Sequence, residues 1–151
     1  MKHFEFTGET KIFLGVTLRR IRATVTFTLA CGLTVHKGDE GGWIEKESNL
    51  CENAWVSGNA RVYGDAFLSR PDHLMEIGKI GSRFDTTTFF RNKEGIIKVT
   101  CGCFYGSIAE FRAKVQQTHG ENKFAKVYMA AAALAELQID VSPVEDETEG
   151  G

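Results

Sequence analysis

Residues 44–68 read IEKESNLCENAWVSGNARVYGDAFL, and they repeat with a period of six. Five aliphatic residues lie six positions apart, and a small residue follows four positions after each of the first four: the aliphatic positions are Ile44, Leu50, Val56, Val62 and Leu68. Gly or Asn stands where the chain would turn, a pattern typical of a left-handed β-helix, in which each short strand points one aliphatic side chain inward. Because three such hexapeptides make one triangular coil, residues 44–70 predict a β-helix of about one and a half coils.

The segment before this repeat predicts strands. Residues 3–31 are rich in Thr, Val, Ile and Phe, and Gly8 and Gly15 mark the breaks between strands. Arg20 and Arg22 fall on one face of the predicted strand because side chains alternate along it. They form either a solvated edge-strand face or a cationic strip for a phosphate.

The segment after the repeat predicts a hairpin followed by two helices. Residues 77–105 alternate as two strands around a turn at 92–95. Ser107 and Glu110 have capping-box spacing and begin the first helix, which ends at His119 and Gly120. Apolar residues at helical spacing predict the second helix over 122–139.

The expected fold class is therefore α+β, with an N-terminal β region and a short left-handed β-helix followed by a small ββαα unit. The predicted domains are 1–70, which includes the β-helix at 44–70, and 71–139 for the ββαα unit. Residues 140–151 contain five acids and no base, which predicts a disordered acidic tail.

Charge and composition exclude several classes of protein. Without the five acids of the tail, residues 1–139 hold 18 bases against 15 acids, a net charge of +3. This body can receive a small anion but lacks the dense Lys/Arg stripe that holds a long nucleic acid. No apolar stretch of membrane-spanning length and no signal-peptide layout occur, so we expect a cytoplasmic protein with no membrane partner.

The sequence predicts no enzyme, no metal and no cofactor. The four cysteines lack the paired spacing of a zinc site, and the four histidines suggest neither a relay nor a metal cluster. No common nucleophile, zinc-protease or dinucleotide motif occurs. Folding could still unite scattered residues, for example Cys103 with His119.

The C-terminal unit holds the predicted ligand site. Cations, Thr hydroxyls and aromatic faces are the groups that a phosphate-and-base ligand requires. The candidate ligand-binding residues are Arg83, Thr86, Thr88, Arg91, Lys98, Tyr105, His119 and Lys123. For Arg91 and Lys98 the alternative is a solvated hairpin face, and for His119 it is a helix C-terminal residue favoured by the helix dipole.

The repeat resembles the hexapeptide-repeat family, whose best-known members are trimeric acyltransferases with a catalytic histidine at a subunit interface. The present repeat contains no histidine, so the resemblance implies an oligomer, a trimer or a multiple of it, rather than that activity. The arrangement of several motifs also resembles a group of phage and prophage proteins. Those motifs lie at 6–10, 18–21, 37–45, 53–56, 102–107 and 118–120.

The chain also resembles compact phage counter-defence proteins in its size, its mildly basic body, its expected oligomerisation and its lack of catalytic motifs. This resemblance implies a phage accessory protein that counters a host defence. We expect it to bind and sequester a small phosphorylated nucleotide signal, such as a cyclic ADP-ribose isomer or a cyclic oligonucleotide, without catalysis. The alternative is a protein-interaction module or structural trimer that masks a host protein. Exposed aromatic residues of the repeat region would then form the contact: Trp43, Trp55, Tyr63 and Phe67.

Overall fold

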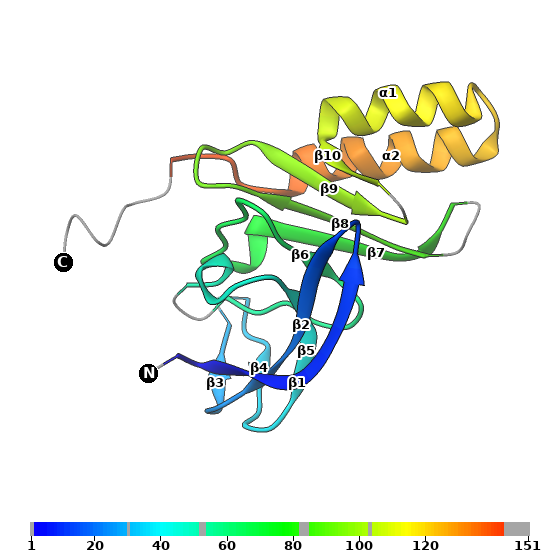
Figure 1. The fold of residues 1–151 in the computed structure, drawn as a ribbon. Helices are drawn as coiled ribbons and strands as arrows, with labels where there is room; N and C mark the ends of the chain where they lie inside the picture. Colours follow the sequence, from blue (N-terminus) through cyan, green and yellow to red (C-terminus); the bar gives the residue numbers. More distant parts are fainter. Residues whose placement is uncertain (1, 30, 52–53, 82–84, 103, 144–151) are drawn as a thin grey trace.

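Two four-stranded sheets form most of the structure, a computed structural model that describes residues 2–29, 31–51, 54–81, 85–102 and 104–143. Two helices cover the second sheet on the side away from the N-terminal region (Figure 1). None of the helices in the described ranges is long and apolar enough to span a membrane.

The N-terminal sheet has the order β1-β2-β5-β6. The prediction of strands over 3–31 is confirmed, because β1, β2 and β3 lie there, and Gly15 adopts positive φ in the tight turn between β1 and β2. Gly8 lies within β1, at an irregularity in the pairing, rather than at a break. The elements are β1 (Phe4–Phe13), β2 (Val16–Ala23), β5 (Glu40–Ile44) and β6 (Arg61–Val62), with a separate pair β3 (Phe27–Thr28) and β4 (Thr34–Val35).

The prediction of a left-handed β-helix is wrong. Most strand pairs are antiparallel, and the described part of 44–70 contributes the last residue of β5, the two-residue strand β6, a few isolated bridge residues and a short 3-10 turn, Glu47–Asn49. Parallel pairing is confined to β5 with β6 and to one bridge between Leu50 and Leu68. No solenoid of stacked coils forms among these residues.

The six-residue period nevertheless marks buried positions. All five aliphatic residues are 0% exposed and share one core with Phe4, Ile21 and Phe90. These partners come from β1, β2 and a strand of the second sheet, β8 (Asp85–Arg91). The period predicted which side chains turn inward, but side chains far away in the sequence cover them in place of further coils.

The second sheet corrects the predicted ββαα unit. It is an antiparallel meander in the order β10-β9-β8-β7, so four strands precede the helices rather than two. Its elements are β7 (Leu74–Ile80), β8, β9 (Ile97–Cys101) and β10 (Phe104–Ser107), followed by α1 (Ile108–His119) and α2 (Lys123–Gln138). The hairpin between β8 and β9, with its turn at 92–95, is confirmed. The two extra strands pair with its outer edges.

The two helices are confirmed close to their predicted bounds. Ser107 caps α1: its Oγ accepts a hydrogen bond from the Glu110 backbone N–H at 3.1 Å, and the Glu110 carboxylate accepts one from the Ser107 N–H at 2.8 Å. Gly120, at positive φ, ends α1, and Asn122 caps α2. These signals act within one turn of chain, which explains why the sequence revealed them.

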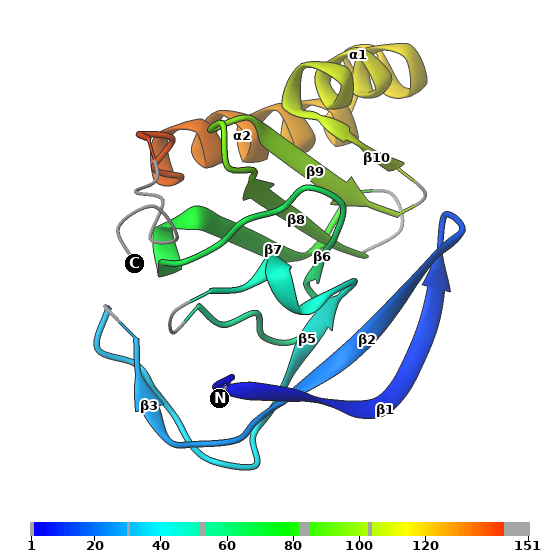
Figure 2. The same cartoon turned by 60° about the vertical axis from the view of Figure 1, so that its left-hand side comes forward.

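β8 joins the two halves of the molecule. Alternation along the strand places Phe89 in the core beneath the helices and Phe90 in the N-terminal core. Polar contacts reinforce this joint, because the Thr88 Oγ accepts from the Arg61 backbone N–H at 3.2 Å, and the Thr100 hydroxyl donates to the Arg61 carbonyl at 2.9 Å. Figure 2 shows the second sheet between the helices and the N-terminal strands.

Close backbone packing in the N-terminal half generates a test of this fold. A Cβ on Gly42 would lie 2.7 Å from a Val56 methyl and 2.8 Å from the Ala60 carbonyl oxygen. We expect Gly42→Ala to lower the free energy of unfolding by about 2 kcal/mol through overpacking, measured by urea denaturation. Gly78→Ala is the matched control, since its nearest neighbour would lie 3.9 Å away. Equal stability of the two variants would contradict the packing described.

Candidate functional site

A hollow of about 360 Å³ lies at one end of the second sheet, beside α1. Its volume is in the range of small-molecule sites, about 300–1,000 Å³. It is lined by Asp85, Cys101, Gly102, Phe104, Phe111, Lys114, Val115, Thr118, His119 and Tyr128. We call these residues the α1 pocket.

Aromatic rings form the walls of the α1 pocket. Phe111 lies 5.7 Å from Phe104 and 5.7 Å from Tyr128, the latter at an angle of 87° between ring planes. The His119 ring stacks against Tyr128 at 5.8 Å with an angle of 28°. Such a wall suits a planar ligand, because offset and edge-to-face ring contacts are favourable.

Helical spacing explains why α1 contributes most of the lining. Phe111, Val115 and Thr118 lie at i, i+4 and i+7, which places them on one stripe of the helix. Phe111 and Val115 are buried at the base of that stripe, whereas Lys114 and Thr118 are exposed. The pocket is therefore apolar inside and polar at its rim.

The acid at the rim is Asp85. Its carboxylate pairs with Arg61 at 3.3 Å and accepts the Thr86 backbone N–H at 2.7 Å. The neighbouring Lys114 offers an ammonium group to an anionic ligand. The rim thus presents both signs of charge within one small site.

Cys101 is a protonated thiol in this setting. Burial raises the pKa of the Cys101 thiol, although hydrogen bonds from Thr87 and Tyr128 oppose this effect. The Thr87 Oγ lies 3.2 Å from the Cys101 Sγ. Because the thiolate is the reactive form, a raised pKa makes this cysteine a poor nucleophile at neutral pH.

The predicted ligand-binding residues are dispersed. Among those that lie in the described residues, only His119 lines the α1 pocket. Thr88 is buried at the contact with Arg61, and Tyr105 faces the N-terminal core, 4.4 Å from the Tyr63 ring. Thr86 and Lys98 are half-buried in the second sheet, and Lys123 is exposed in the first turn of α2. Arg83 and Cys103 lie outside the described residues, as do 144–151 of the predicted tail.

Sequence reasoning missed most of the pocket. Asp85 and Cys101 stand on neighbouring strands, and nothing local to either residue signals that α1 passes over them. The stripe of Phe111, Val115 and Thr118 is readable from helical spacing, but spacing alone does not distinguish the lining of a pocket from core packing.

Arg91 lies in a second polar cluster, away from this pocket. Its guanidinium is 0% exposed, and its Nη1 donates to the carbonyls of Asp140 at 2.6 Å and Ser142 at 2.8 Å. Its Nε donates to the Asn92 carbonyl at 3.1 Å. Burial lowers the pKa of Arg91, whereas the nearby carboxylates of Asp140 and Asp72 act in the opposite direction. Arg91 thus holds the segment after α2, and its predicted role in ligand binding stays a prediction.

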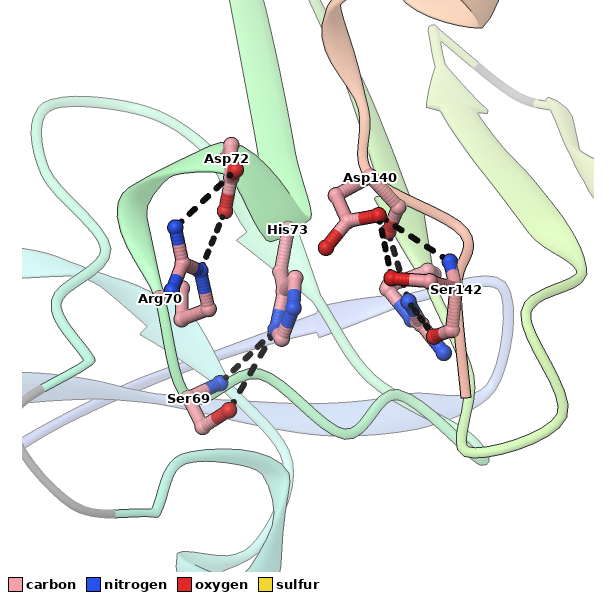
Figure 3. Close-up of polar contacts among 7 residues, drawn as sticks. Ser69, Arg70, Asp72, His73, Asp140 and Ser142 are labelled. Carbon is pink, nitrogen blue, oxygen red and sulfur yellow. Dashed lines mark hydrogen bonds and ion pairs between the residues drawn. The ribbon is translucent and has the colours of Figure 1, made fainter. Parts of the chain in front are cut away.

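His73 stands beside this cluster, opposite the segment that carries Asp140 and Ser142 (Figure 3). The Ser69 backbone N–H donates to the His73 Nδ1 at 3.1 Å, so the neutral ring carries its proton on Nε2. Burial is the main reason that the pKa of His73 falls below its ordinary value, and the positive charge of Arg91 lowers it further.

Hydrogen bonds already occupy the groups that a metal ion would need here. Ligand atoms of Asp72, His73 and Asp140 lie within 4.8 Å of one another. Arg70 binds the Asp72 carboxylate at 3.0 Å, and Ser142 binds that of Asp140 at 2.6 Å. Because the neutral His73 ring also has no free lone pair, this cluster is better described as a structural contact.

The Arg91 contacts predict a loss of stability when the guanidinium is removed. Arg91→Met keeps a long side chain but deletes the bonds to the carbonyls of Asp140 and Ser142. We expect the free energy of unfolding to fall by about 2 kcal/mol, since hydrogen bonds to charged groups are stronger than neutral ones. Hydrogen exchange should also accelerate at 139–142. Unchanged exchange there would show that Arg91 does not hold this segment.

The position of His73 predicts a pH dependence of stability. Because its folded pKa lies below the unfolded value of 6.5, the stabilisation from the neutral ring is complete above pH 6.5. It is lost progressively as the pH falls below 6.5 toward the lowered folded value. In His73→Asn the side-chain oxygen can still accept the Ser69 N–H, and the loss of stability at low pH should be smaller than in the unmodified protein. The midpoint of thermal unfolding, recorded at a series of pH values, measures this loss. His36→Asn, at an exposed histidine, is the control.

Comparison with known proteins leaves the family open. No family model matches the chain, and no solved structure matches it. A segment of 47 residues is 43% identical to dihydrofolate reductase from Drosophila melanogaster, and it covers 31% of this chain and 26% of that protein. The chain thus spans about a quarter of the length of this curated relative.

Proposed function

We propose that the protein binds a small phosphorylated nucleotide in the α1 pocket and sequesters it chemically unchanged. The observation that carries this proposal is an aromatic-walled hollow of about 360 Å³ with Lys114 at its rim. A planar base would pack against the aromatic wall that Phe104, Phe111 and Tyr128 form. The ammonium group of Lys114 would pair with a phosphate, and the Thr118 hydroxyl would donate to it.

The chemistry of the lining favours binding over catalysis. The Cys101 thiol is protonated, and the Asp85 carboxylate is engaged by Arg61 and by a backbone N–H. A catalytic nucleophile or base needs a lone pair that is free and basic enough to react near neutral pH. These two groups instead suit ligand recognition: the Cys101 thiol as a buried contact, and the Asp85 carboxylate as a hydrogen-bond acceptor at the rim.

The resemblance to phage proteins supplies the wider role in this proposal. A protein that binds a nucleotide signal without converting it would sequester that signal in the host cytoplasm and so counter a host defence. The partial match to dihydrofolate reductase adds a second candidate ligand, dihydrofolate, whose planar ring and carboxylates offer the same two features. The reductase activity belongs to the Drosophila protein, and this chain matches about a quarter of the length of that protein.

Calorimetric titration tests the proposal directly. The panel comprises cyclic ADP-ribose isomers, cyclic di- and trinucleotides, AMP and dihydrofolate, each recovered afterwards by chromatography. We expect binding of one phosphorylated nucleotide with the ligand recovered intact. A changed ligand would establish an enzyme, and silence across the nucleotides would contradict the proposed ligand class.

Paired variants on α1 locate the binding site. Thr118→Trp places a large ring in the α1 pocket, whereas Gln117→Trp adds the same ring at the next exposed position, outside the lining. We expect Thr118→Trp to weaken binding by at least about tenfold, which is roughly 1.4 kcal/mol, and Gln117→Trp to leave it unchanged. Lys114→Ala should weaken the binding of phosphorylated ligands more than the binding of the corresponding nucleosides. Equal affinity of the two Trp variants would place the ligand elsewhere.

A further inference from the structure

The helix α2 is apolar on two opposite faces. Its inner face packs on the second sheet and α1 through five buried residues: Ala125, Tyr128, Ala131, Ala132 and Ala135. Its outer face carries Leu134, which is 50% exposed, and Leu137, which is 86% exposed. Ala130 and Ala133 are also exposed and continue the same stripe, because these four positions recur at helical spacing.

The neighbouring helix α1 differs from α2, because its outer face is polar rather than apolar. The exposed positions of α1 include Lys114, Gln116, Gln117 and Thr118, as expected for a helix with one solvated face. The outer face of α2 is instead apolar from Ala130 to Leu137, a feature that normally marks a face packed against another element. Within the described residues of the single chain this stripe is exposed and unpartnered.

The outer stripe is complementary to itself. In an antiparallel pair of α2 helices related by a two-fold axis between residues 133 and 134, Leu137 lies opposite the partner's Ala130. In the same register, Leu134 lies opposite the partner's Ala133. Each large side chain therefore meets a small one, which is the requirement for close packing of two helices.

The charges along α2 suit the same arrangement. Lys123 and Lys126 are exposed in the N-terminal part of the helix, where the first turn holds no acid, and the last turn holds no base. In this register Lys126 lies opposite the partner's Val141, three residues past the end of the partner's helix at Gln138. Its long side chain can reach back to the negative pole of that helix dipole, which stabilises the pair.

We propose that α2 pairs antiparallel with α2 of a second copy of this chain, through Ala130, Ala133, Leu134 and Leu137. The pairing uses the face of α2 opposite the α1 pocket, because Tyr128, the α2 residue in the described lining, stands on the buried inner face of the helix. This surface is independent of the proposed ligand. It also requires an even number of subunits, so of the states implied by the hexapeptide-repeat resemblance it excludes a trimer but allows a hexamer.

Sedimentation of the full chain over a concentration series tests the pairing. We expect the unmodified protein to sediment as a dimer and Leu137→Lys to sediment as a monomer. The substitution should not destabilise the fold of the single chain, because the Leu137 side chain is 86% exposed. Leu33→Lys, at a leucine that is 61% exposed in the N-terminal half, should remain a dimer. A monomer at the highest soluble concentration, a trimer, or a dimer that survives Leu137→Lys would each overturn the proposal.

Cross-linking tests the register. Ala133→Cys stands beside the proposed axis, so mild oxidation should give a disulfide-linked dimer beyond the background of the native cysteines. Gln117→Cys, on the exposed face of α1, should give that background only. Equal cross-linking of the two variants would overturn the antiparallel register.

Discussion

Burial of β8 from both sides is the constraint on which the rest of the structure depends. Phe89 and Phe90 are adjacent in the chain, both are 0% exposed, and they belong to different cores. A strand buried on both faces needs two covering layers, which the helices and the N-terminal half supply. The backbone of Arg61 bonds to Thr88 and Thr100 at this boundary, so these buried polar groups are paired.

The candidate site follows from how far the helical layer extends along the sheet. α1 begins directly after β10 and is held in place by the Ser107 cap. Its inner stripe runs past the strand ends that carry Asp85 and Cys101, and the α1 pocket is the space left there. α2 closes one side of this space with Tyr128, while its opposite face remains exposed. Recognition of a ligand and association of subunits can therefore use two faces of one helix without competing.

Arg91 has a structural role in this fold that its residue type does not reveal. An arginine on a predicted hairpin suggests a phosphate ligand; its side chain is fully buried, and its Nη1 donates to two backbone carbonyls after α2, whereas its Nη2 has no hydrogen-bond partner among the described residues. A buried guanidinium is costly unless it is bonded, so it also specifies where that segment must lie. Local alternation in a strand indicates two faces, and it does not indicate which of them other elements cover.

The sequence by itself determined the features that depend on residues close together in the chain. These are the capped helices, the turn at 92–95 and the inward direction of the five aliphatic residues of the repeat. Only the tertiary structure decided what covers those residues, how many strands join the second sheet and which side chains line a pocket. Burial and strand pairing are non-local, because they depend on which distant segments meet, and a six-residue period is compatible with any partner that excludes water from its inner face.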